Sequence, residues 1–535
     1  MGIGIVQTKY GKVQGVELDG KYQGITYFKA IPYAAPPVGA LRWRPPQEPE
    51  KWDGVRNCDT FAKMAPQKFP PIERFVPYGL DFYYEGYPEC SEDCLYLNVC
   101  TGASDRNEKR PVYMWFHGGG LNTGFSYEIE FNPEELTRKG IIVVQVAQRL
   151  NVFGYLTLPQ LSAEQGGASG NYGLMDQIQA LRWVKENIAE FGGDPDNITI
   201  GGQSGGTTKV CSMVALPSTQ GMVKRVICES GLKWKQEFNP LEVAYRRSQK
   251  YLQKLGIDPD VDVETLRAMD VWEICDGSHD MPEEVVFDGK LIPCSRVDEL
   301  FNRYMGQVDF LCGSNNGEGS PWADPKDKTK KVFQTKEEFY ENYRALLGDM
   351  YDECDFEKLY PVTDENSWET ALRIYNLGLT HNDRRGVSRN LMLCRMFGMD
   401  RAEKAAGSKV FTYLFSHVLP GRPEDEGTPR DTKKLLAYHS SEMWYVFASL
   451  RENVPPVRPW REVDYEVADM ASSYWANFIA TGDVNGEGLP YWPASSDNYG
   501  MLEILPEPKA YEGIDSAQDQ FLRAYVEKTF NFDEN

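Results

Sequence analysis

Long hydrophobic runs are absent from this sequence. Its longest apolar runs, residues 112–116 and 141–147, fall far short of the about 20 residues that a membrane-spanning helix requires. Residues 1–6 also lack the basic and long apolar regions of a signal peptide. We therefore expect no membrane span and a cytoplasmic protein, or a secreted one if a leader peptide was removed.

Basic charge is also scarce. The chain of 535 residues contains 57 Lys and Arg against 79 Asp and Glu, which gives a net charge of −22. An acidic surface repels phosphate backbones, so we expect no nucleic acid partner. The expected partner is a small molecule that is neutral or cationic, and the sequence leaves the oligomeric state open.

Cysteine and histidine are few and scattered. The chain has 11 Cys and 5 His, and the close cysteine pairs, Cys90 with Cys94 and Cys94 with Cys100, have no histidine near them at the spacing of a zinc site. We expect no metal and no cofactor. Most of the cysteines should be reduced and buried.

The order of apolar segments predicts the fold class. Consecutive apolar residues, typical of strands buried on both faces of a parallel sheet, occur at residues 112–116, 141–147, 198–200, 226–228, 310–312 and 410–415. Three- and four-residue spacing over 174–191 predicts a helix that ends at Gly192. Without repeats or long linkers, residues 1–535 should form a single α/β domain.

A Gly-x-Ser-x-Gly pattern spans residues 202–206, directly after a predicted strand and before a predicted helix at 207–216. A nucleophilic serine needs its hydroxyl on a sharp, crowded turn, and glycines at positions 202 and 206 avoid the clashes. Ser204 is therefore the candidate nucleophile. The alternative is a glycine-rich turn that binds phosphate or only packs.

A second glycine-rich segment, His117 followed by residues 118–120, comes after the strand at 112–116. Consecutive glycines let backbone amides converge on one point, which is what a tetrahedral oxyanion requires. We expect the amides of Gly119, Gly120 and Gly205 to form an oxyanion hole. A plain turn is the alternative for this segment alone.

A serine nucleophile needs a base and an acid that orients it. The order nucleophile, acid, histidine excludes His117 and favours His439, which lies in a loop after the strand at 410–415. His381 is interpreted as a cap or surface residue and His417 as a structural or rim residue. Glu318, in a glycine-flanked turn after the strand at 310–312, is the candidate acid, with a solvated surface carboxylate as the alternative.

These motifs resemble the type-B carboxylesterase/lipase family of the α/β-hydrolase superfamily, which includes cholinesterases, liver carboxylesterases and bacterial para-nitrobenzyl esterases. The resemblance covers nearly the whole chain and is carried by residues 28–34, 92–99, 171–174, 191–195, 202–206 and 489–493. It implies a large, mostly parallel central sheet flanked by helices, with long insertions that form a gorge or lid. It also implies the triad Ser204, Glu318 and His439.

The same resemblance implies further features. Ser230 and Glu442 would support the active-site network, and Cys58 would form a disulfide with Cys94, with Cys90 as a competing partner. The segment 58–94 is expected to be a lid or gorge rim, and 319–435 a helical insertion between acid and histidine. Gly205 departs from the family, which usually has alanine at this position.

The predicted function is hydrolysis of carboxylic esters through an acyl-enzyme, acting on small to medium aryl or short-chain acyl esters. A feruloyl or hydroxycinnamoyl esterase and a lipase are alternatives within the same fold. A binding protein that lacks catalysis is an alternative of another class, and the complete triad argues against it.

Overall fold

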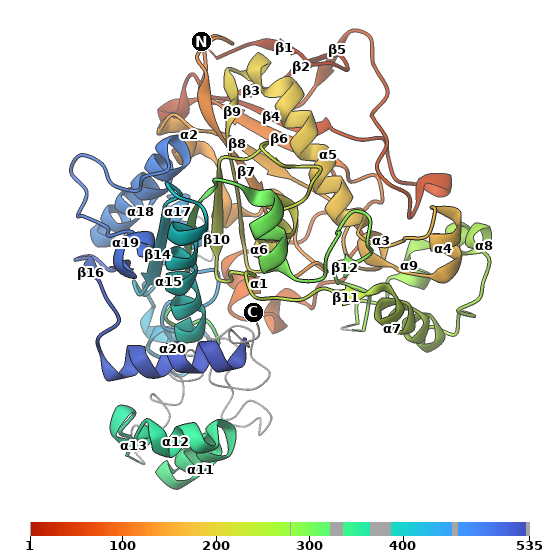
Figure 1. Cartoon of the computed structure of the whole chain (residues 1–535). Helices are drawn as coiled ribbons and strands as arrows, with labels where there is room; N and C mark the ends of the chain where they lie inside the picture. The colour runs from red at the N-terminus through yellow and green to blue at the C-terminus, as the bar shows by residue number, and fades with distance from the viewer. Residues whose placement is uncertain (1, 279, 321–334, 364–386, 452–457, 531–535) are drawn as a thin grey trace.

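The computed structural model describes residues 2–278, 280–320, 335–363, 387–451 and 458–530 (Figure 1). Its centre is a sheet of 11 strands in the described residues. In sheet order these are β16 (Lys509–Tyr511), β15 (Met501–Ile504), β14 (Val410–Phe415), β13 (Asp309–Asn315), β10 (Arg225–Glu229), β9 (Gly193–Gln203), β7 (Arg110–Phe116), β8 (Ile142–Val146), β6 (Tyr96–Thr101), β4 (Thr26–Pro32) and β3 (Val16–Glu17).

The six strands predicted from apolar runs correspond to β7, β8, β9, β10, β13 and β14. From β8 through β15 all neighbours pair in parallel, whereas β3, β4, β6 and β16 pair antiparallel at the edges. The sequence did not predict these edge strands because polar residues such as Lys29 and Asn98 interrupt their apolar positions. The strand at 410–415 is also not the last one, since β15 and β16 follow it.

Helices cover both faces of this sheet (Figure 1). Along β7, Val112, Met114 and Phe116 contact the apolar cluster that contains residues of α5 (Tyr172–Asn187), α6 (Gly205–Val214) and α15 (Val387–Lys404). The alternate residues Tyr113 and Trp115 contact the opposite cluster, with α17 (Met443–Val446) and α18 (Glu462–Thr481). Burial on both faces explains the consecutive apolar residues of the central strands.

The helix predicted over 174–191 is α5, which continues as a tight 3-10 turn at Ile188–Phe191 and ends at Gly192 with φ of +83°. A left-handed residue at this position favours glycine, because other side chains are strained there. The helix predicted over 207–216 is α6, which starts two residues earlier, directly after Ser204.

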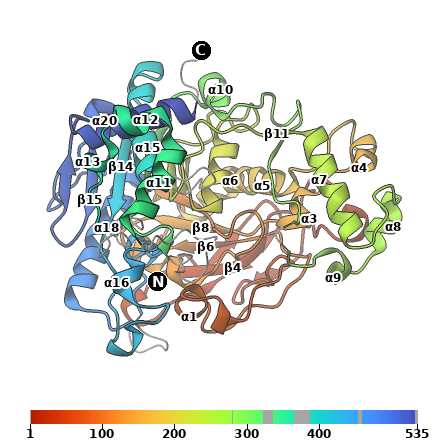
Figure 2. The same ribbon diagram turned by 90° about the horizontal axis from the view of Figure 1, so that it is seen from below.

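The span 319–435 is only partly the helical insertion that we expected. Its described residues include α11 (Lys336–Leu347), α12 (Asp349–Glu353), α13 (Phe356–Leu359) and α15, but also β14, which pairs with β13 and β15 in the central sheet. The helical insertion therefore lies between β13 and β14. In Figures 1 and 2 its first three helices lie beside α20 (Ala517–Thr529), where Phe356 contacts Phe521 at 6.1 Å between ring centroids.

The remaining described elements lie outside the central sheet. Two small sheets contain β1 (Ile5–Gln7), β2 (Lys12–Gln14) and β5 (Val55–Asn57), and β11 (Asn239–Pro240) with β12 (Val286–Phe287). The other α-helices are α1 (Tyr78–Asp81), α2 (Glu134–Arg138), α3 (Asn151–Tyr155), α4 (Pro159–Glu164), α7 (Leu241–Lys254), α8 (Val263–Ala268), α9 (Val271–Ile274), α10 (Val297–Leu300), α16 (Thr432–Leu435) and α19 (Ser495–Asn498). Within the described ranges, every helix is too short or too polar to cross a bilayer.

The disulfide implied between Cys58 and Cys94 is not present. All eleven cysteines, these two and Cys90 included, are free thiols. Cys58 and Cys94 are buried in the same apolar cluster, and burial raises the pKa of Cys58 to about 11 and the pKa of Cys94 well above its usual value. A protonated thiol is a poor nucleophile, so this environment disfavours disulfide exchange at both residues.

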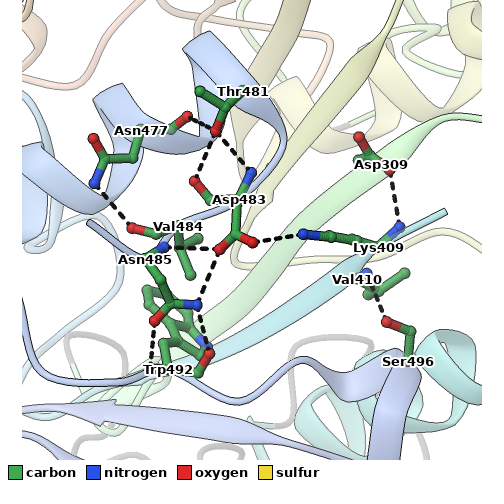
Figure 3. A network of polar contacts seen from close by, with 10 residues as sticks. All are labelled: Asp309, Lys409, Val410, Asn477, Thr481, Asp483, Val484, Asn485, Trp492 and Ser496. Atoms are coloured by element: carbon green, nitrogen blue, oxygen red, sulfur yellow. Dashed lines mark hydrogen bonds and ion pairs between the residues drawn. The ribbon is translucent and has the colours of Figure 1, made fainter. Parts of the chain in front are cut away.

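A polar network joins the amino ends of β13 and β14 to the segment that follows α18 (Figure 3). Lys409, just before β14, bonds through its backbone amide to Asp309 of β13 (2.9 Å) and through its ammonium to Asp483 (2.5 Å). Asp483 follows α18 and also accepts hydrogen bonds from the backbone and side chain of Asn485. This network anchors the end of α18 at the amino ends of the parallel strands. Ser204 lies at the opposite end of the sheet, because it follows the carboxyl end of β9.

Candidate active site

The predicted site residues follow the carboxyl ends of neighbouring strands. The 118–120 loop follows β7, and Ser204, Ser230 and Glu318 follow β9, β10 and β13. These strands are parallel, so their carboxyl ends meet at the same edge, where ligands bind in open α/β sheets. His439 lies in a loop between β14 and α17.

Ser204 occupies a strained turn. Its backbone has φ of +56° and ψ of −117°, and its amide donates to the carbonyl of Glu229 at 2.8 Å. A methyl group added at Gly202 would lie 2.6 Å from the backbone of Gly206, and one added at Gly206 would lie 2.2 Å from the Phe116 carbonyl. The structure therefore requires both glycines of the motif, for the steric reason that the sequence indicated.

The 118–120 loop packs directly against this turn. Gly119 and Gly120 have φ of +79° and +65°, the left-handed region that favours glycine. A methyl group added at Gly205 would lie 2.1 Å from the Gly120 carbonyl oxygen and 2.4 Å from its carbonyl carbon. Glycine at 205, where alanine was the usual residue of the resemblance, is thus matched to a close approach of the loop.

The acid and the histidine contact each other. Nδ1 of His439 is hydrogen-bonded to Oε2 of Glu318, and the other carboxylate oxygen accepts from the amide of Asn315 at 2.9 Å. Both side chains are buried. A bridge between Gly317 and Tyr438, with a 2.9 Å bond from the Asn315 side chain to the Tyr438 carbonyl, holds the two loops together.

Two of the other histidines are described. His117 is buried behind the glycine loop, and burial lowers its pKa well below its usual value. His417 bonds through Nε2 to Asp464 at 2.7 Å, which agrees with its interpretation as a structural residue. His279 and His381 lie outside the described residues.

A group of buried carboxyl groups lies next to Glu318 and His439. The Ser230 hydroxyl donates to one carboxyl oxygen of Glu442 at 3.3 Å, and the side-chain amide of Asn315 donates to the other. Ser230 and Glu442, which we expected to support the active site, therefore contact each other. Burial, with Glu229 and then Glu318 nearby, raises the pKa of Glu442 well above its usual value. These contacts hold the strand ends that precede Ser230 and Glu318 together.

Glu229 is a member of this group that sequence reasoning missed. Its Oε1 accepts from the indole of Trp475 at 2.8 Å, and its Oε2 has no hydrogen-bond partner in the described part of the chain. Burial raises the pKa of Glu229 to about 8. The available signal was its position immediately before Ser230, but a strand-end glutamate usually faces solvent.

A cavity of about 1420 Å³ opens onto Ser204, His439, Gly119, Gly120 and Gly205. Aromatic residues of the 58–94 segment form one wall: Phe69, Phe75, Tyr78, Phe82 and Tyr83. The hydroxyl of Tyr78 donates to the His439 carbonyl at 3.0 Å. The segment predicted as a lid or gorge rim thus lines the cavity, and the remaining lining mixes basic residues such as Lys233 with acidic residues such as Glu283.

The pKa of Glu229 predicts a pH effect on stability. Because its pKa is about 8 in the folded protein and 4.5 ordinarily, the folded protein keeps a proton that the unfolded chain releases between these values. The raised pKa therefore adds to the free energy of unfolding at low pH, and this added stability is lost as pH rises from 4.5 to about 8. Between pH 6 and pH 9, the melting temperature of Glu229→Gln should therefore fall less than that of the wild type. Equal losses would contradict the assignment, and exposed Glu264→Gln on α8 is the control.

Comparisons with known proteins agree with this architecture. A model of the carboxylesterase family matches residues 3–522. The chain is 29% identical to rabbit (Oryctolagus cuniculus) liver carboxylesterase 1, covering 97% of this chain and 92% of that protein, and 28% identical to mouse (Mus musculus) carboxylesterase 1F, covering 94% and 90%.

Solved structures give the same result. A carboxylesterase of Geobacillus stearothermophilus is similar with a TM-score of 0.76 at 28% identity, covering 97% of this chain and 99% of that one. A PNB esterase matches with a TM-score of 0.73 at 25% identity, covering 97% and 100%. The matches extend over nearly the whole of each chain, and the fold is that of the α/β hydrolases. The chain is a carboxylic-ester hydrolase and belongs to the carboxylesterase family.

Proposed function

We propose that this protein hydrolyses esters through a covalent acyl-enzyme on Ser204. The observation that carries the proposal is the hydrogen bond between His439 and Glu318, in the same cavity as a serine on a strained strand-to-helix turn. A serine hydroxyl is a weak nucleophile without an adjacent base, and a carboxylate on Nδ1 orients the imidazole so that Nε2 can act as the proton acceptor. Nε2 of His439 lies 3.3 Å from the side-chain nitrogen of Gln203, the residue before Ser204.

In the first step the Ser204 oxygen attacks the ester carbonyl and His439 takes the hydroxyl proton. The negative oxygen of the tetrahedral intermediate accepts hydrogen bonds from the amides of Gly119, Gly120 and Gly205. His439 then gives the proton to the departing alcohol. In the second step His439 takes a proton from the water that attacks the acyl-enzyme, and it passes this proton to the Ser204 oxygen as the bond to the acyl group breaks and the acid leaves. Glu318 stabilises the imidazolium in both steps.

The cavity supports a preference for aryl or short-chain acyl esters. Its volume of about 1420 Å³ exceeds the roughly 300–1,000 Å³ of common small-molecule sites, so medium-sized esters also fit. The aromatic wall of the 58–94 segment offers ring faces for an aryl group. The mixed charges elsewhere in the lining disfavour a long, purely apolar chain, which argues for an esterase over a lipase.

Replacement of the nucleophile is the direct test of the mechanism. Ser204→Ala should retain the wild-type melting curve and lower kcat for a short-chain para-nitrophenyl ester by at least about 10³-fold, since the unit of nucleophile and base is lost. Wild type should also be labelled by a fluorophosphonate, and the variant should not. Labelling that persists in Ser204→Ala, or unchanged turnover, would contradict the mechanism; a binding protein would give neither turnover nor labelling.

Gly205→Ala tests the fit between the glycine loop and the nucleophile turn. The added methyl group must displace the Gly120 backbone, and loss of one oxyanion donor costs about 10²–10³ in kcat. We expect kcat to fall at least tenfold in a folded protein. Gly256→Ala, where the added methyl group meets no atom but the φ of +76° is strained for alanine, controls for backbone strain far from the loop and should keep wild-type kcat. Wild-type kcat in Gly205→Ala would show that the loop does not need this spacing.

A substrate panel tests the specificity. We expect kcat/KM for phenyl and naphthyl esters of short acids to exceed that for matched long-chain aliphatic esters by at least tenfold. Feruloyl esters distinguish the hydroxycinnamoyl alternative. Higher activity on emulsified triglyceride than on soluble esters would overturn the esterase assignment in favour of a lipase. All esters in the panel should be uncharged, so that differences in kcat/KM report the shape of the substrate and not its charge.

A further inference from the structure

Lys209 is a buried cation that the mechanism above does not use. It lies on α6, five residues after Ser204, and only 1% of its surface is exposed. Burial of an ammonium group is costly unless it is paired. The fold thus accommodates this lysine at a position that is unfavourable for stability.

The contacts of Lys209 point to the glycine loop. Its Nζ donates to the backbone carbonyl of His117 at 2.8 Å. His117 is the residue that links β7 to the loop carrying Gly119 and Gly120. With its side-chain oxygen turned toward both groups, Gln148 accepts from Nε2 of His117 (2.7 Å) and from Nζ of Lys209 (3.1 Å). The ammonium therefore binds the first carbonyl of the loop directly, and it is linked to the His117 imidazole through the side chain of Gln148.

Gly118, Gly119 and Gly120 have no side chains that could fix the loop, which is held by contacts to its backbone carbonyls. The Gly119 carbonyl accepts from the backbone amide (2.9 Å) and the hydroxyl (3.2 Å) of Thr123, and the Gly118 carbonyl lies 3.0 Å from Nδ1 of His117. The loop must nevertheless keep van der Waals contact with Gly205 on α6. Lys209 extends from α6 and binds the carbonyl of His117 at the start of the loop. This bond constrains the distance between the loop and Gly205, the two segments that would form the oxyanion hole.

We propose that Lys209 is a positioning residue for ester hydrolysis: its ammonium holds the 117–120 loop against the helix of the nucleophile, so that the oxyanion donors of both segments converge. This inference rests on the proposed function of Ser204. Lys209 does not line the cavity as described, so it acts through the loop and not through contact with substrate.

The charge of Lys209 adds a second contribution. A cation behind the loop favours the negative oxygen that develops in the transition state. Burial lowers the pKa of Lys209 to about 7, and the nearby carboxylate of Glu128 opposes this shift. Glu128 accepts from the amide of Phe125 (2.8 Å) and the hydroxyl of Tyr83 (2.9 Å), and burial raises its pKa. Glu130, next to Glu128, and His117 are further titratable groups near Lys209. Lys209 should therefore lose its proton in the range of ordinary assays.

Lys209→Met is the first test, because methionine keeps the length and burial of the side chain and removes both the donor and the charge. With a short-chain para-nitrophenyl ester, we expect kcat to fall at least tenfold while KM changes less than about threefold. Affinity for a trifluoromethyl ketone inhibitor, which forms the tetrahedral adduct, should fall by the same factor as kcat/KM. Lys209→Gln, which keeps a neutral donor, should recover part of the lost rate.

The pH profile separates the charge from packing. Wild type should lose its advantage in kcat over Lys209→Met as pH rises from 6 to 9, because the wild-type ammonium is neutralised over this range. A purely structural role would leave the ratio of the two rates constant. Cys211→Ala, also buried on α6, controls for general destabilisation of the helix and should keep wild-type kcat below its melting temperature.

The outcomes distinguish this inference from the proposed function. Folded Lys209→Met with kcat within twofold of wild type, or with equal losses in inhibitor and product affinity, would overturn the role of Lys209 and leave the Ser204 mechanism intact. If Lys209→Met does not fold, wild-type kcat in folded Lys209→Gln at both pH 6 and pH 9 would overturn it equally. Activity that persists in Ser204→Ala would instead refute the mechanism itself.

Discussion

The site depends on one steric constraint, the contact between two backbones at the carboxyl edge of the sheet. The turn of Ser204 and the loop after β7 approach so closely that a methyl group at Gly205 or Gly206 would overlap a carbonyl of the other segment, at 2.1 Å and 2.2 Å. Only glycine permits this approach. The strained φ of Ser204, the start of α6 and the position of the 118–120 loop all follow from it.

Electrostatics at this edge is organised by burial. Three carboxyl groups, those of Glu229, Glu318 and Glu442, are buried behind Ser204 and His439, and burial raises the pKa of Glu229 and of Glu442. A neutral Glu229 and a neutral Glu442 add no negative charge beside Glu318, which is hydrogen-bonded to His439. On the other side of the loop, the buried Lys209 supplies the opposite charge near the place where the oxyanion would form.

The cavity wall and the catalytic loop are also coupled. Tyr78, from the aromatic segment, donates to the carbonyl of His439, and Tyr83 donates to Glu128, which in turn acts on Lys209. The same segment that shapes the substrate space therefore contacts the histidine loop and the surroundings of the glycine loop. Changes in that wall should therefore affect the position of His439 as well as substrate fit.

The sequence by itself determined the α/β class, the central strands and the candidate triad, because these depend on local patterns: consecutive apolar residues, a glycine-flanked serine and an order of residues along the chain. It could not determine the edge strands, whose polar residues hide the pattern, or that Cys58 and Cys94 are free thiols. Only the tertiary structure brought Glu229, Lys209 and Gln148 to the site. Their roles depend on long-range contacts and on removal from water, and neither is encoded in the residues next to them.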